Sequence, residues 1–455
     1  MLFSSIPFLY YFLPAALILY ALTPRALKNT AILLVSLVFY AWGEPRLVVL
    51  MAATVMSGYL LALLTERFPK QKKLYLALAV VISLGFLVCY KYADFFITNF
   101  NSLTGLSVPL LRIALPIGIS FYTFQILSYN IDVYRGTVPA QRNPVDLGAY
   151  IAFFPQLIAG PIVRYSDIAF QLRERRHSMA KTASGIRRFV MGLSKKILIA
   201  NVLGELCDIF RNSDEKTVLF YWMYAVAFSL HIYFDFSGYS DMAIGLGKLF
   251  GFDFIENFNY PYISKSATEF WRRWHMSLGT WFRDYVYIPL GGSRVGKVKM
   301  FFNIFVVWML TGFWHGAAWN FIVWGLYFAV LLVVEKMFLL KYLERSKVLS
   351  RIYILFLVMI SFIIFNASDM GEAFQYIRGL FGGAPLSNGE TVYYLKSYLL
   401  VFIIAIVGST PIVKKAAERS RALSCAEPVA LIALLFVCTA YLVDGSFNPF
   451  LYFRF

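Results

Sequence analysis

The sequence predicts an all-α, polytopic membrane protein with about 11 transmembrane helices, plus re-entrant or interfacial helices. Of its 455 residues, 60% are hydrophobic and 18% aromatic, and only 15% are charged, which is the composition of a chain solvated by lipid. A helix needs about 20 mostly apolar residues to cross a bilayer core. Apolar segments of about this reach recur along the chain, near residues 5–22, 30–43, 47–64, 74–90, 113–130, 147–163, 218–247, 301–335, 352–366, 396–412 and 428–444.

These segments differ in length, and the difference bears on the number of crossings. Residues 218–247 and 301–335 are long enough to bend, re-enter or split into two helices. The charges between the segments place both chain ends outside, which requires an even number of crossings. We therefore expect one of the segments 113–130 and 147–163 to re-enter the membrane without crossing it. No convincing cleavage site follows the first apolar run, so we interpret it as a retained span.

The formal net charge of +17 is interpreted mainly as a topology signal. Clusters with a basic excess lie between the apolar segments, and the positive-inside rule places them in the cytoplasm. Because these Lys and Arg residues flank hydrophobic spans, they do not form the basic face of a soluble nucleic-acid-binding domain. The sequence thus indicates a multi-pass protein of the cell (inner or cytoplasmic) membrane. The clusters are Glu66–Lys73, Arg164–Lys196, Lys336–Arg351 and Lys414–Arg421.

The chain is predicted to form one transmembrane domain, residues 1–455, with three regions. Residues 1–110 and 336–455 contain ordinary spans. Residues 111–335 combine apolar runs with Arg, Asp, His, Gly and Pro at high density. Polar groups are costly in lipid, so this central region must face protein or water and is the expected catalytic core.

Cysteine spacing favours neither a metal site nor a disulfide framework. The four cysteines lie in or beside apolar segments and are expected to be packing residues. There is no G-x-S-x-G elbow and no close His-rich cluster, which disfavours a membrane serine hydrolase or a zinc enzyme. The cysteines are Cys89, Cys207, Cys425 and Cys438.

His315 is the first candidate catalytic residue. It lies in VVWMLTGFWHGAAWNFIVWG, residues 306–325, a segment that carries no formal charge. An imidazole is costly in such a setting unless it has a task or a partner. Desolvation favours its neutral form, which is the form that a general base needs. The alternative is a neutral histidine that bonds a backbone carbonyl between helices.

His275 is the second candidate. It lies in EFWRRWHMSLGTWFRDYVYIPLGG, residues 269–292, where charged residues alternate with tryptophans. This pattern is typical of a membrane-surface belt that holds its own ion pairs. It also fits the floor of a site in which cations bind a phosphate-bearing donor, followed by a turn at Gly291–Gly292 where backbone can approach a ligand.

His231 and Asp235 form an H-x-x-x-D string, which one soluble acyltransferase class also uses. Residues four apart share a helix face, so a local ion pair explains the string equally well. We interpret the polar residues around it as the lining of a cavity inside the membrane region. His177, in the basic stretch QLRERRHSMAK, is expected to lie on the surface. The expected lining residues are Asp235, Ser237, Tyr239, Asp241 and Asn320.

Two further strings contain Pro, Gly and polar residues within sequence that is otherwise apolar enough to lie in a membrane. They are LPIGISFYTFQILSYNIDVYRG (115–136) and FFPQLIAGPIVRY (153–165). The pattern indicates discontinuous helices beside a cavity, while simple kinks at the prolines Pro116, Pro155 and Pro161 explain it as well.

Taken together, five strings in one order resemble the membrane-bound O-acyltransferase family, and within it the alginate O-acetyltransferase branch. The resemblance covers most of residues 1–445. The strings are the two above, YFDFSGYSDMAIGLG, FWRRWHMSLGTWFRDYVYIPLGG and TGFWHGAAWNFIVWG.

The resemblance implies a many-helix fold around a central tunnel, where a donor from the cytoplasm meets an acceptor from the other side. Its near-invariant histidine falls on His315 and its second histidine on His275. The implied donor is acetyl-CoA or another acyl thioester, used as a substrate, with no permanently bound cofactor. We assign donor binding to Arg272, Arg273, Trp274 and Arg283, with Arg294 and Lys297 nearby.

The resemblance also implies an acceptor, which is a hydroxyl of a cell-envelope polysaccharide, of peptidoglycan or of an extracytoplasmic relay protein. His315 is expected to take the proton from that hydroxyl, while His275 or neighbouring donors steady the carbonyl oxygen. The segment RDYVYIPLGG favours O-acetylation over D-alanyl transfer to teichoic acid, which stays an alternative. Broken helices with polar residues also suit a transporter or flippase, and a structural scaffold would leave His315 unexplained.

Overall fold

The computed structural model of the chain describes residues 1–445, without the side chains of residues 421–424. All regular elements in this part of the chain are helices, which confirms the predicted all-α class. The predicted outside position of the C-terminal end concerns residues 446–455, which lie outside the described residues.

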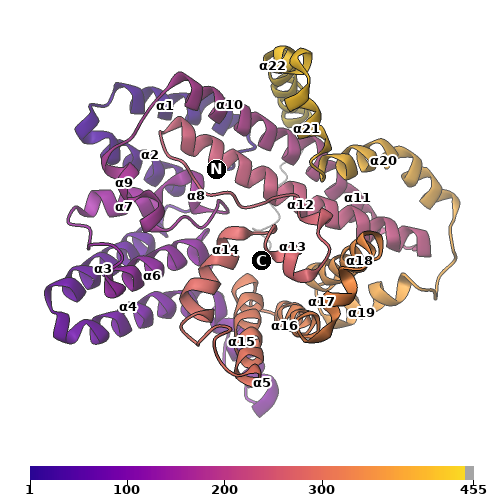
Figure 1. Cartoon of the computed structure of the whole chain (residues 1–455), viewed down its shortest axis with the longest axis horizontal. Helices are drawn as coiled ribbons and strands as arrows, with labels where there is room; N and C mark the ends of the chain where they lie inside the picture. The colour runs from indigo at the N-terminus through magenta and orange to yellow at the C-terminus, as the bar shows by residue number, and fades with distance from the viewer. Residues whose placement is uncertain (446–455) are drawn as a thin grey trace. The chain divides into compact units, whose positions relative to one another are not determined.

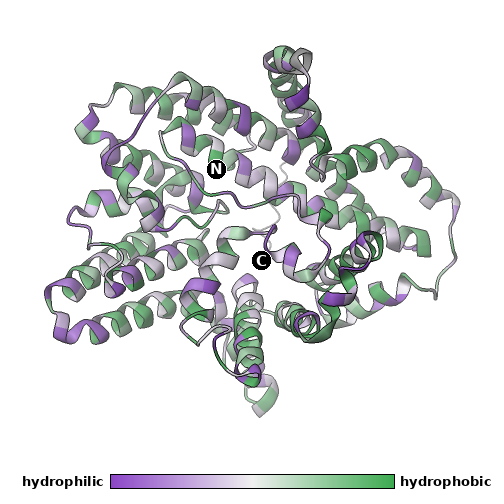
Figure 2. Cartoon of the chain, in the orientation of Figure 1, coloured by the Kyte–Doolittle hydropathy of each residue, from purple (hydrophilic) through white to green (hydrophobic). Residues whose placement is uncertain are grey.

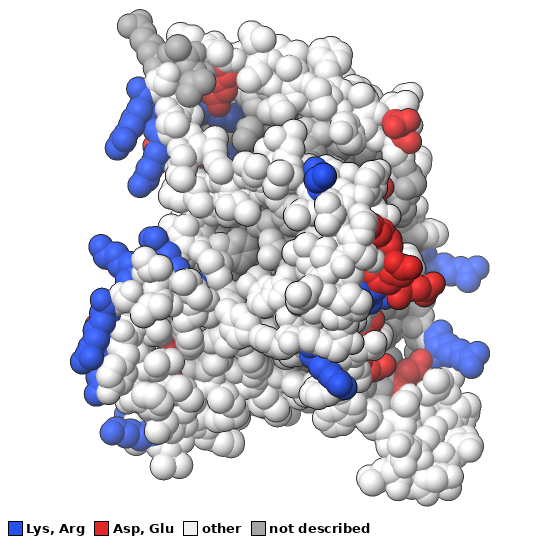
Figure 3. Space-filling model, turned by 90° about the vertical axis from the view of Figure 1, so that its right-hand side faces the viewer, with Lys and Arg blue, Asp and Glu red and all other residues white. Residues whose placement is uncertain are grey.

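Within residues 1–445, nine helices are long and apolar enough to cross a bilayer, against about 11 predicted. An apolar helix at Phe8–Leu22 is shorter. Hydrophobic residues cover most of the long helices in Figure 2. On the face drawn in Figure 3, most charged side chains of both signs lie near the edges, and few lie between them. The nine helices are Arg25–Gly43, Val48–Arg67, Pro69–Thr104, Val218–Leu249, Lys297–His315, Trp319–Leu343, Lys347–Asn366, Gly389–Gly408 and Cys425–Asp444.

The described chain forms two compact units, which share the helices α10 and α12 (Figure 1). Unit 1 comprises Met1–Phe189 and Ser240–Ile255. Its helices are α1 (Leu13–Leu22), α2 (Lys28–Gly43), α3 (Val48–Arg67), α4 (Lys72–Leu87), α5 (Ala93–Thr104), α6 (Ile119–Arg135), α7 (Pro144–Ala152), α8 (Phe154–Leu157), α9 (Tyr165–Arg173), most of α10 (Met179–Ser194) and the end of α12 (Val218–Leu249).

The two strings rich in proline and glycine meet inside unit 1. Gly118 has a φ of +76°, and a Cβ at this position would lie 2.5 Å from the carbonyl oxygen of Leu157. Only glycine tolerates both the left-handed backbone and this approach. Helix α6 begins after Gly118 and runs unbroken to Arg135, whereas Phe153 separates α7 from α8. The break between α7 and α8 agrees with one of the two interpretations of the second string, that of discontinuous helices. Both α7, with nine residues, and α8, with four, are too short to cross a bilayer.

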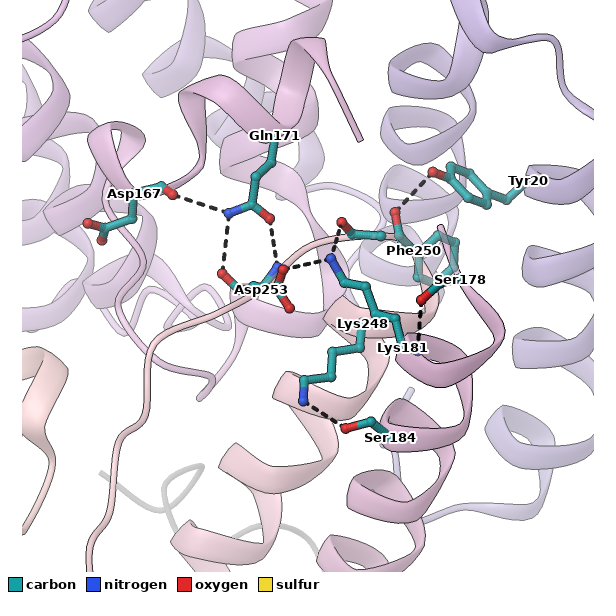
Figure 4. A network of polar contacts seen from close by, with 10 residues as sticks. Tyr20, Asp167, Gln171, Ser178, Lys181, Ser184, Lys248, Phe250 and Asp253 are labelled. Atoms are coloured by element: carbon teal, nitrogen blue, oxygen red, sulfur yellow. Dashed lines mark hydrogen bonds and ion pairs between the residues drawn. The ribbon is translucent and has the colours of Figure 1, made fainter. Parts of the chain in front are cut away.

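A polar network joins α1, α9, α10 and the segment after α12 within unit 1 (Figure 4). Lys181 on α10 bonds the Gly251 carbonyl oxygen at 2.8 Å and pairs with Asp253 at 2.7 Å. Gln171 on α9 accepts a hydrogen bond from the Asp253 backbone N–H at 2.7 Å. His177 is exposed, as predicted, and lies 3.2 Å from the Tyr20 hydroxyl.

Unit 2 comprises Val190–Tyr239 and, as far as the structure is described, residues 256–445. It contains both candidate catalytic histidines. Its helices are the end of α10, most of α12, and α11 (Val202–Asn212), α13 (Ala267–Trp271), α14 (Met276–Phe282), α15 (Lys297–His315), α16 (Trp319–Val334), α17 (Leu340–Leu343), α18 (Lys347–Asn366), α19 (Met370–Gly379), α20 (Gly389–Gly408), α21 (Ile412–Arg419) and α22 (Arg421–Asp444).

The two longest apolar segments behave differently. Residues 301–335 split, as one interpretation of their length predicted, into α15 and α16, which are joined by the small residues Gly316, Ala317 and Ala318. Residues 218–247 form one unbroken helix, α12, of 32 residues. Its glycines are packing contacts: a Cβ at Gly238 would lie 2.8 Å from the carbonyl oxygen of Gly192 on α10.

The cysteine prediction is correct for two of the four residues. Cys207 and Cys438 are buried, whereas Cys89 and Cys425 are exposed. The expectation of packing was wrong for the exposed pair, because a membrane helix has an outer face on which a small apolar side chain costs little.

Candidate active site

His315 is the last residue of α15, and aromatic rings surround it. Its ring lies edge-on to those of Trp314, Trp324 and Phe365, with centroid distances of 5.0, 5.1 and 5.3 Å. The side chain is buried but keeps 7% of its surface accessible.

Two glycines set the position of the helix that carries His315. A Cβ at Gly312 on α15 would lie 2.2 Å from the carbonyl oxygen of Phe321 on α16. A Cβ at Gly325 on α16 would lie 2.2 Å from the carbonyl oxygen of Trp308 on α15. Small residues at such positions allow membrane helices to touch backbone to backbone. The close approach fixes α15 against α16 within one turn of His315.

His275 lies between α13 and α14 in an unusual backbone conformation. Its φ and ψ are 45° and 51°, the left-handed region that non-glycine residues rarely adopt. The segment before α13 holds this conformation through two backbone hydrogen bonds. The Asn259 N–H bonds the Arg273 carbonyl oxygen at 2.9 Å, and the Met276 N–H bonds the Asn257 carbonyl oxygen at 3.0 Å.

The imidazole of His275 is almost fully buried, with 2% of the residue exposed. Its Nδ1 lies 3.1 Å from Oδ1 of Asn257, and its ring meets Phe236 edge-on at 4.7 Å. Its Nε2 has no hydrogen-bond partner among the described residues. Burial lowers the pKa of His275 to about 3, so the ring is neutral at physiological pH.

Trp314 links the two histidines. Its ring centroid lies 6.1 Å from that of His275 and 5.0 Å from that of His315. The fold of unit 2 thus brings together the two residues that the sequence predicted to be catalytic, although 40 positions separate them.

A buried carboxylate anchors the short helix before His275. Glu335, which directly follows α16, accepts hydrogen bonds from the backbone N–H groups of Ala267 at 2.6 Å and Thr268 at 2.9 Å. These are N–H groups of the first turn of α13, which otherwise lack partners and carry the positive end of the helix dipole. Glu335 is 1% exposed, so this cap ties the loop of His275 to the helix pair of His315.

The predicted donor-binding residues have different surroundings. Arg272 is exposed. Arg273 pairs with Glu269 at 2.9 Å, and Arg283 pairs with Asp284 at 2.6 Å. Trp274 is buried and stacks on Phe270. These ion pairs agree with the membrane-belt interpretation of the segment, and a donor-binding role for the arginines and Trp274 stays a prediction. Arg294 and Lys297 are exposed.

The polar residues of α12 belong to both units. Asp235, Ser237 and Tyr239 are buried in unit 2. Asp235 pairs at 2.5 Å with Lys196, which is 2% exposed. Asp241 belongs to unit 1, where it pairs with Arg188 at 2.7 Å.

The remaining predicted polar residues bond backbone carbonyls. His231 Nδ1 lies 2.6 Å from the Ala200 carbonyl oxygen. Asn320 donates to the carbonyl oxygens of Phe365 at 3.3 Å and Ala367 at 3.0 Å, at the end of α18. The lining of a tunnel by Asn320 and the polar residues of α12 stays a prediction.

Three residues of this site were missed by the sequence analysis: Asn257, Trp314 and Glu335. Trp314 stands beside His315, but no local pattern distinguishes it from the other eight tryptophans of the chain. Glu335 was counted as the last residue of the apolar segment 301–335, next to the basic cluster that begins at Lys336, and was not considered as a site residue. Asn257 gave no signal, because its contact with His275 depends on how the chain folds back.

The arrangement suits proton transfer in a water-poor setting. The imidazoles of His275 and His315 lie on either side of Trp314, and both residues are buried. A neutral imidazole can accept a proton from a hydroxyl. Among residues 1–445, no three His, Cys, Asp or Glu side chains are grouped as metal ligands would be.

Comparison with known proteins finds a family model and several relatives that are named as enzymes of cell-envelope polymer modification. Residues 110–368 match the model of the membrane-bound O-acyltransferase family. A probable alginate O-acetylase AlgI of Azotobacter vinelandii is 38% identical over 499 aligned residues, which cover all of both chains. A peptidoglycan O-acetyltransferase of Helicobacter pylori is 32% identical over 89% of this chain and 83% of its own. A teichoic acid D-alanyltransferase of Bacillus subtilis, 32% identical, matches only 49% of this chain and 59% of its own.

The family match spans more than half of the chain, and the match to the Azotobacter protein runs from end to end. Both candidate histidines lie within the matched region. The chain is a multi-pass membrane protein and an O-acyltransferase, and it belongs to the membrane-bound O-acyltransferase family.

Proposed function

We propose that this enzyme transfers an acetyl group from a cytosolic thioester, such as acetyl-CoA, to a hydroxyl of a cell-envelope polysaccharide or of peptidoglycan. Transfer can pass through the hydroxyl of a relay protein outside the cytoplasm. The proposal places the enzyme in the inner (cytoplasmic) membrane. The observation that carries it is the pairing of His315 and His275 around Trp314 in unit 2, in a chain whose full-length relatives are named as O-acetyl-transferring enzymes.

In the proposed reaction, His315 accepts the proton of the acceptor hydroxyl as its oxygen attacks the thioester carbonyl. The new C–O bond forms, the C–S bond breaks, and the proton passes from His315 to the departing thiolate. A thioester is already activated, so the enzyme mainly has to align two substrates and supply a base. The aromatic enclosure of His315 excludes water, which strengthens these electrostatic contacts.

O-acetylation is favoured over D-alanyl transfer by the extent of the comparisons. The relatives named for O-acetyl transfer match 84–100% of this chain, against 49–50% for the two D-alanyltransferases. A transporter is disfavoured because aromatic rings pack around both imidazoles. An enzyme can use imidazoles in this setting, whereas a substrate that moves past them would have to displace the rings.

The test uses inside-out membrane vesicles from a strain that carries the gene and from one that lacks it. These vesicles keep the native polymer and any relay protein in place. [14C]Acetyl-CoA supplied at the cytoplasmic face should label the polymer with alkali-labile ester, only with the gene present. His315→Gln should abolish this labelling. Transfer of [14C]D-alanine in place of acetyl, or flux of label that does not depend on a thioester, would contradict the proposal.

A further inference from the structure

The side-chain amide of Asn257 has a defined orientation. The backbone N–H of Ser277 points to its Oδ1 at 3.3 Å, and the Ser277 hydroxyl donates to the same atom at 2.9 Å. A backbone N–H can only donate. The amide atom that faces His275 and Ser277 is therefore the oxygen, which settles the usual ambiguity between the two ends of an asparagine side chain.

This orientation determines the tautomer of His275. Since Oδ1 of Asn257 can only accept, the Nδ1 of His275 at 3.1 Å has to donate. A neutral imidazole has one N–H, so Nδ1 carries the proton and Nε2 carries a lone pair. That nitrogen is buried and has no hydrogen-bond partner among the described residues. An unsatisfied buried acceptor is destabilising, and a hydrogen-bond donor from a bound substrate would satisfy it.

The same segment also holds the backbone of His275. Residues 257–259 form the two backbone hydrogen bonds that keep His275 in its left-handed conformation. Such a conformation is strained for a non-glycine residue and persists only where the surroundings enforce it. Asn257 thus fixes the residue twice, through its carbonyl to Met276 and through its side chain to the imidazole.

We infer that Asn257 is a positioning residue that keeps His275 in the Nδ1–H form, so that Nε2 accepts a hydrogen bond from a hydroxyl of the acyl acceptor. The inference rests on the proposed function for the identity of the substrate, but the tautomer does not depend on it. His275 then cannot steady the carbonyl oxygen in this form, because its Nε2 has no proton to donate. That task falls to other donors, and His275 helps to orient the hydroxyl that His315 deprotonates.

The tautomer can be measured directly by solid-state NMR of the full chain labelled with [15N]histidine. The chain has four histidines, and the loss of one pair of signals in His275→Gln assigns that residue. We expect a protonated Nδ1 and an unprotonated Nε2 for His275 in the wild-type protein. A protonated Nε2 would overturn the inference.

Variants of Asn257 provide the second arm. Asn257→Leu removes the acceptor at similar volume, so the His275 signals should show a mixture of tautomers, and kcat should fall about 100-fold, as expected for a misplaced catalytic geometry. Asn257→Asp keeps an acceptor oxygen and should retain the Nδ1–H form. The matched control is Asn303→Leu, which removes another buried amide of unit 2 that bonds the carbonyl oxygens of Leu290 and Gly292, and which should leave the tautomer unchanged.

The outcomes separate the two proposals. If Asn257→Leu keeps both the tautomer and the wild-type kcat, or if Asn303→Leu disturbs the tautomer equally, Asn257 has no positioning role. If the wild-type protein shows the Nδ1–H form but the vesicles incorporate no acetyl label, the proposed function fails while the tautomer assignment stands.

Discussion

Gly312→Ala is expected to reduce acetyl transfer about 100-fold while the protein still inserts and folds. The new Cβ would lie 2.2 Å from the Phe321 carbonyl oxygen, whereas ordinary contacts of this kind begin at 3.4 Å. Helices α15 and α16 would have to separate by about 1.2 Å, the difference between these distances, because neither atom belongs to a flexible side chain. His315 lies three residues further along α15 and would move with it. A misplacement of about 1 Å can cost about 100-fold in rate.

The assay measures initial rates of acetyl incorporation in vesicles, together with the apparent Tm of the purified protein. Overpacking of this kind costs about 1–3 kcal/mol, so the Tm should fall by a few degrees. Gly85→Ala on α4 is the matched control, because a Cβ there meets no heavy atom of the described residues within 4 Å. This exchange removes a glycine from a helix and should leave the rate unchanged and the Tm equal or higher.

Two results would refute this reasoning. A rate for Gly312→Ala within twofold of wild type would mean that the contact between α15 and α16 does not position the reacting groups. An equal loss of rate in Gly85→Ala would mean that any alanine in a membrane helix has this effect.

Three further predictions concern buried charges and His275. Glu335→Ala should lower the apparent Tm, because two backbone N–H groups lose their hydrogen-bond acceptor, which costs about 1–3 kcal/mol of stability. An unchanged Tm would show that water replaces the lost carboxylate as acceptor. Lys196→Met should destabilise the fold by about 3–5 kcal/mol, because Asp235 stays buried without the Lys196 ammonium. The double variant Lys196→Met/Asp235→Leu should recover most of this loss. A double variant as unstable as Lys196→Met would contradict the prediction. The pKa of His275 is about 3 in the folded state and about 6.5 in the unfolded state. Between these two pH values only the unfolded state binds the proton, so the free energy of unfolding decreases as the pH falls. The decrease is about 2 kcal/mol at pH 5. Thermal unfolding from pH 7.5 to 5 should show a weaker decline in His275→Gln, and equal declines would contradict the assigned burial.

Hydropathy was sufficient to predict the class of fold, because lipid requires long apolar helices whatever their packing. It did not predict where long segments break. Residues 301–335 split at Gly316–Ala318, and residues 218–247 do not split, although both contain glycine. The difference is tertiary: Gly238 is accommodated inside α12 by close contact with Gly192 on another helix, which no local pattern reveals.

The two histidines could be predicted as candidates because an ionisable group in an apolar setting is costly and therefore conspicuous. Their convergence on Trp314 could not be predicted, because it depends on the crossing of α15 with α16 and on the backbone of His275. Asn257 lies 18 residues before His275, and Glu335 lies 68 residues after Ala267. At such separations, an asparagine in a loop and a glutamate at the end of an apolar run have no local feature that marks them as part of a site.

The most direct test of the central claim compares two histidine variants in the vesicle assay with [14C]acetyl-CoA. His315→Gln removes the proposed base from its aromatic enclosure, whereas His177→Gln changes an exposed histidine of unit 1. We predict that His315→Gln incorporates no more alkali-labile acetyl than vesicles without the gene, and that His177→Gln incorporates as much as wild type. Acetyl incorporation by His315→Gln at the wild-type rate would contradict the assignment of His315 as the base.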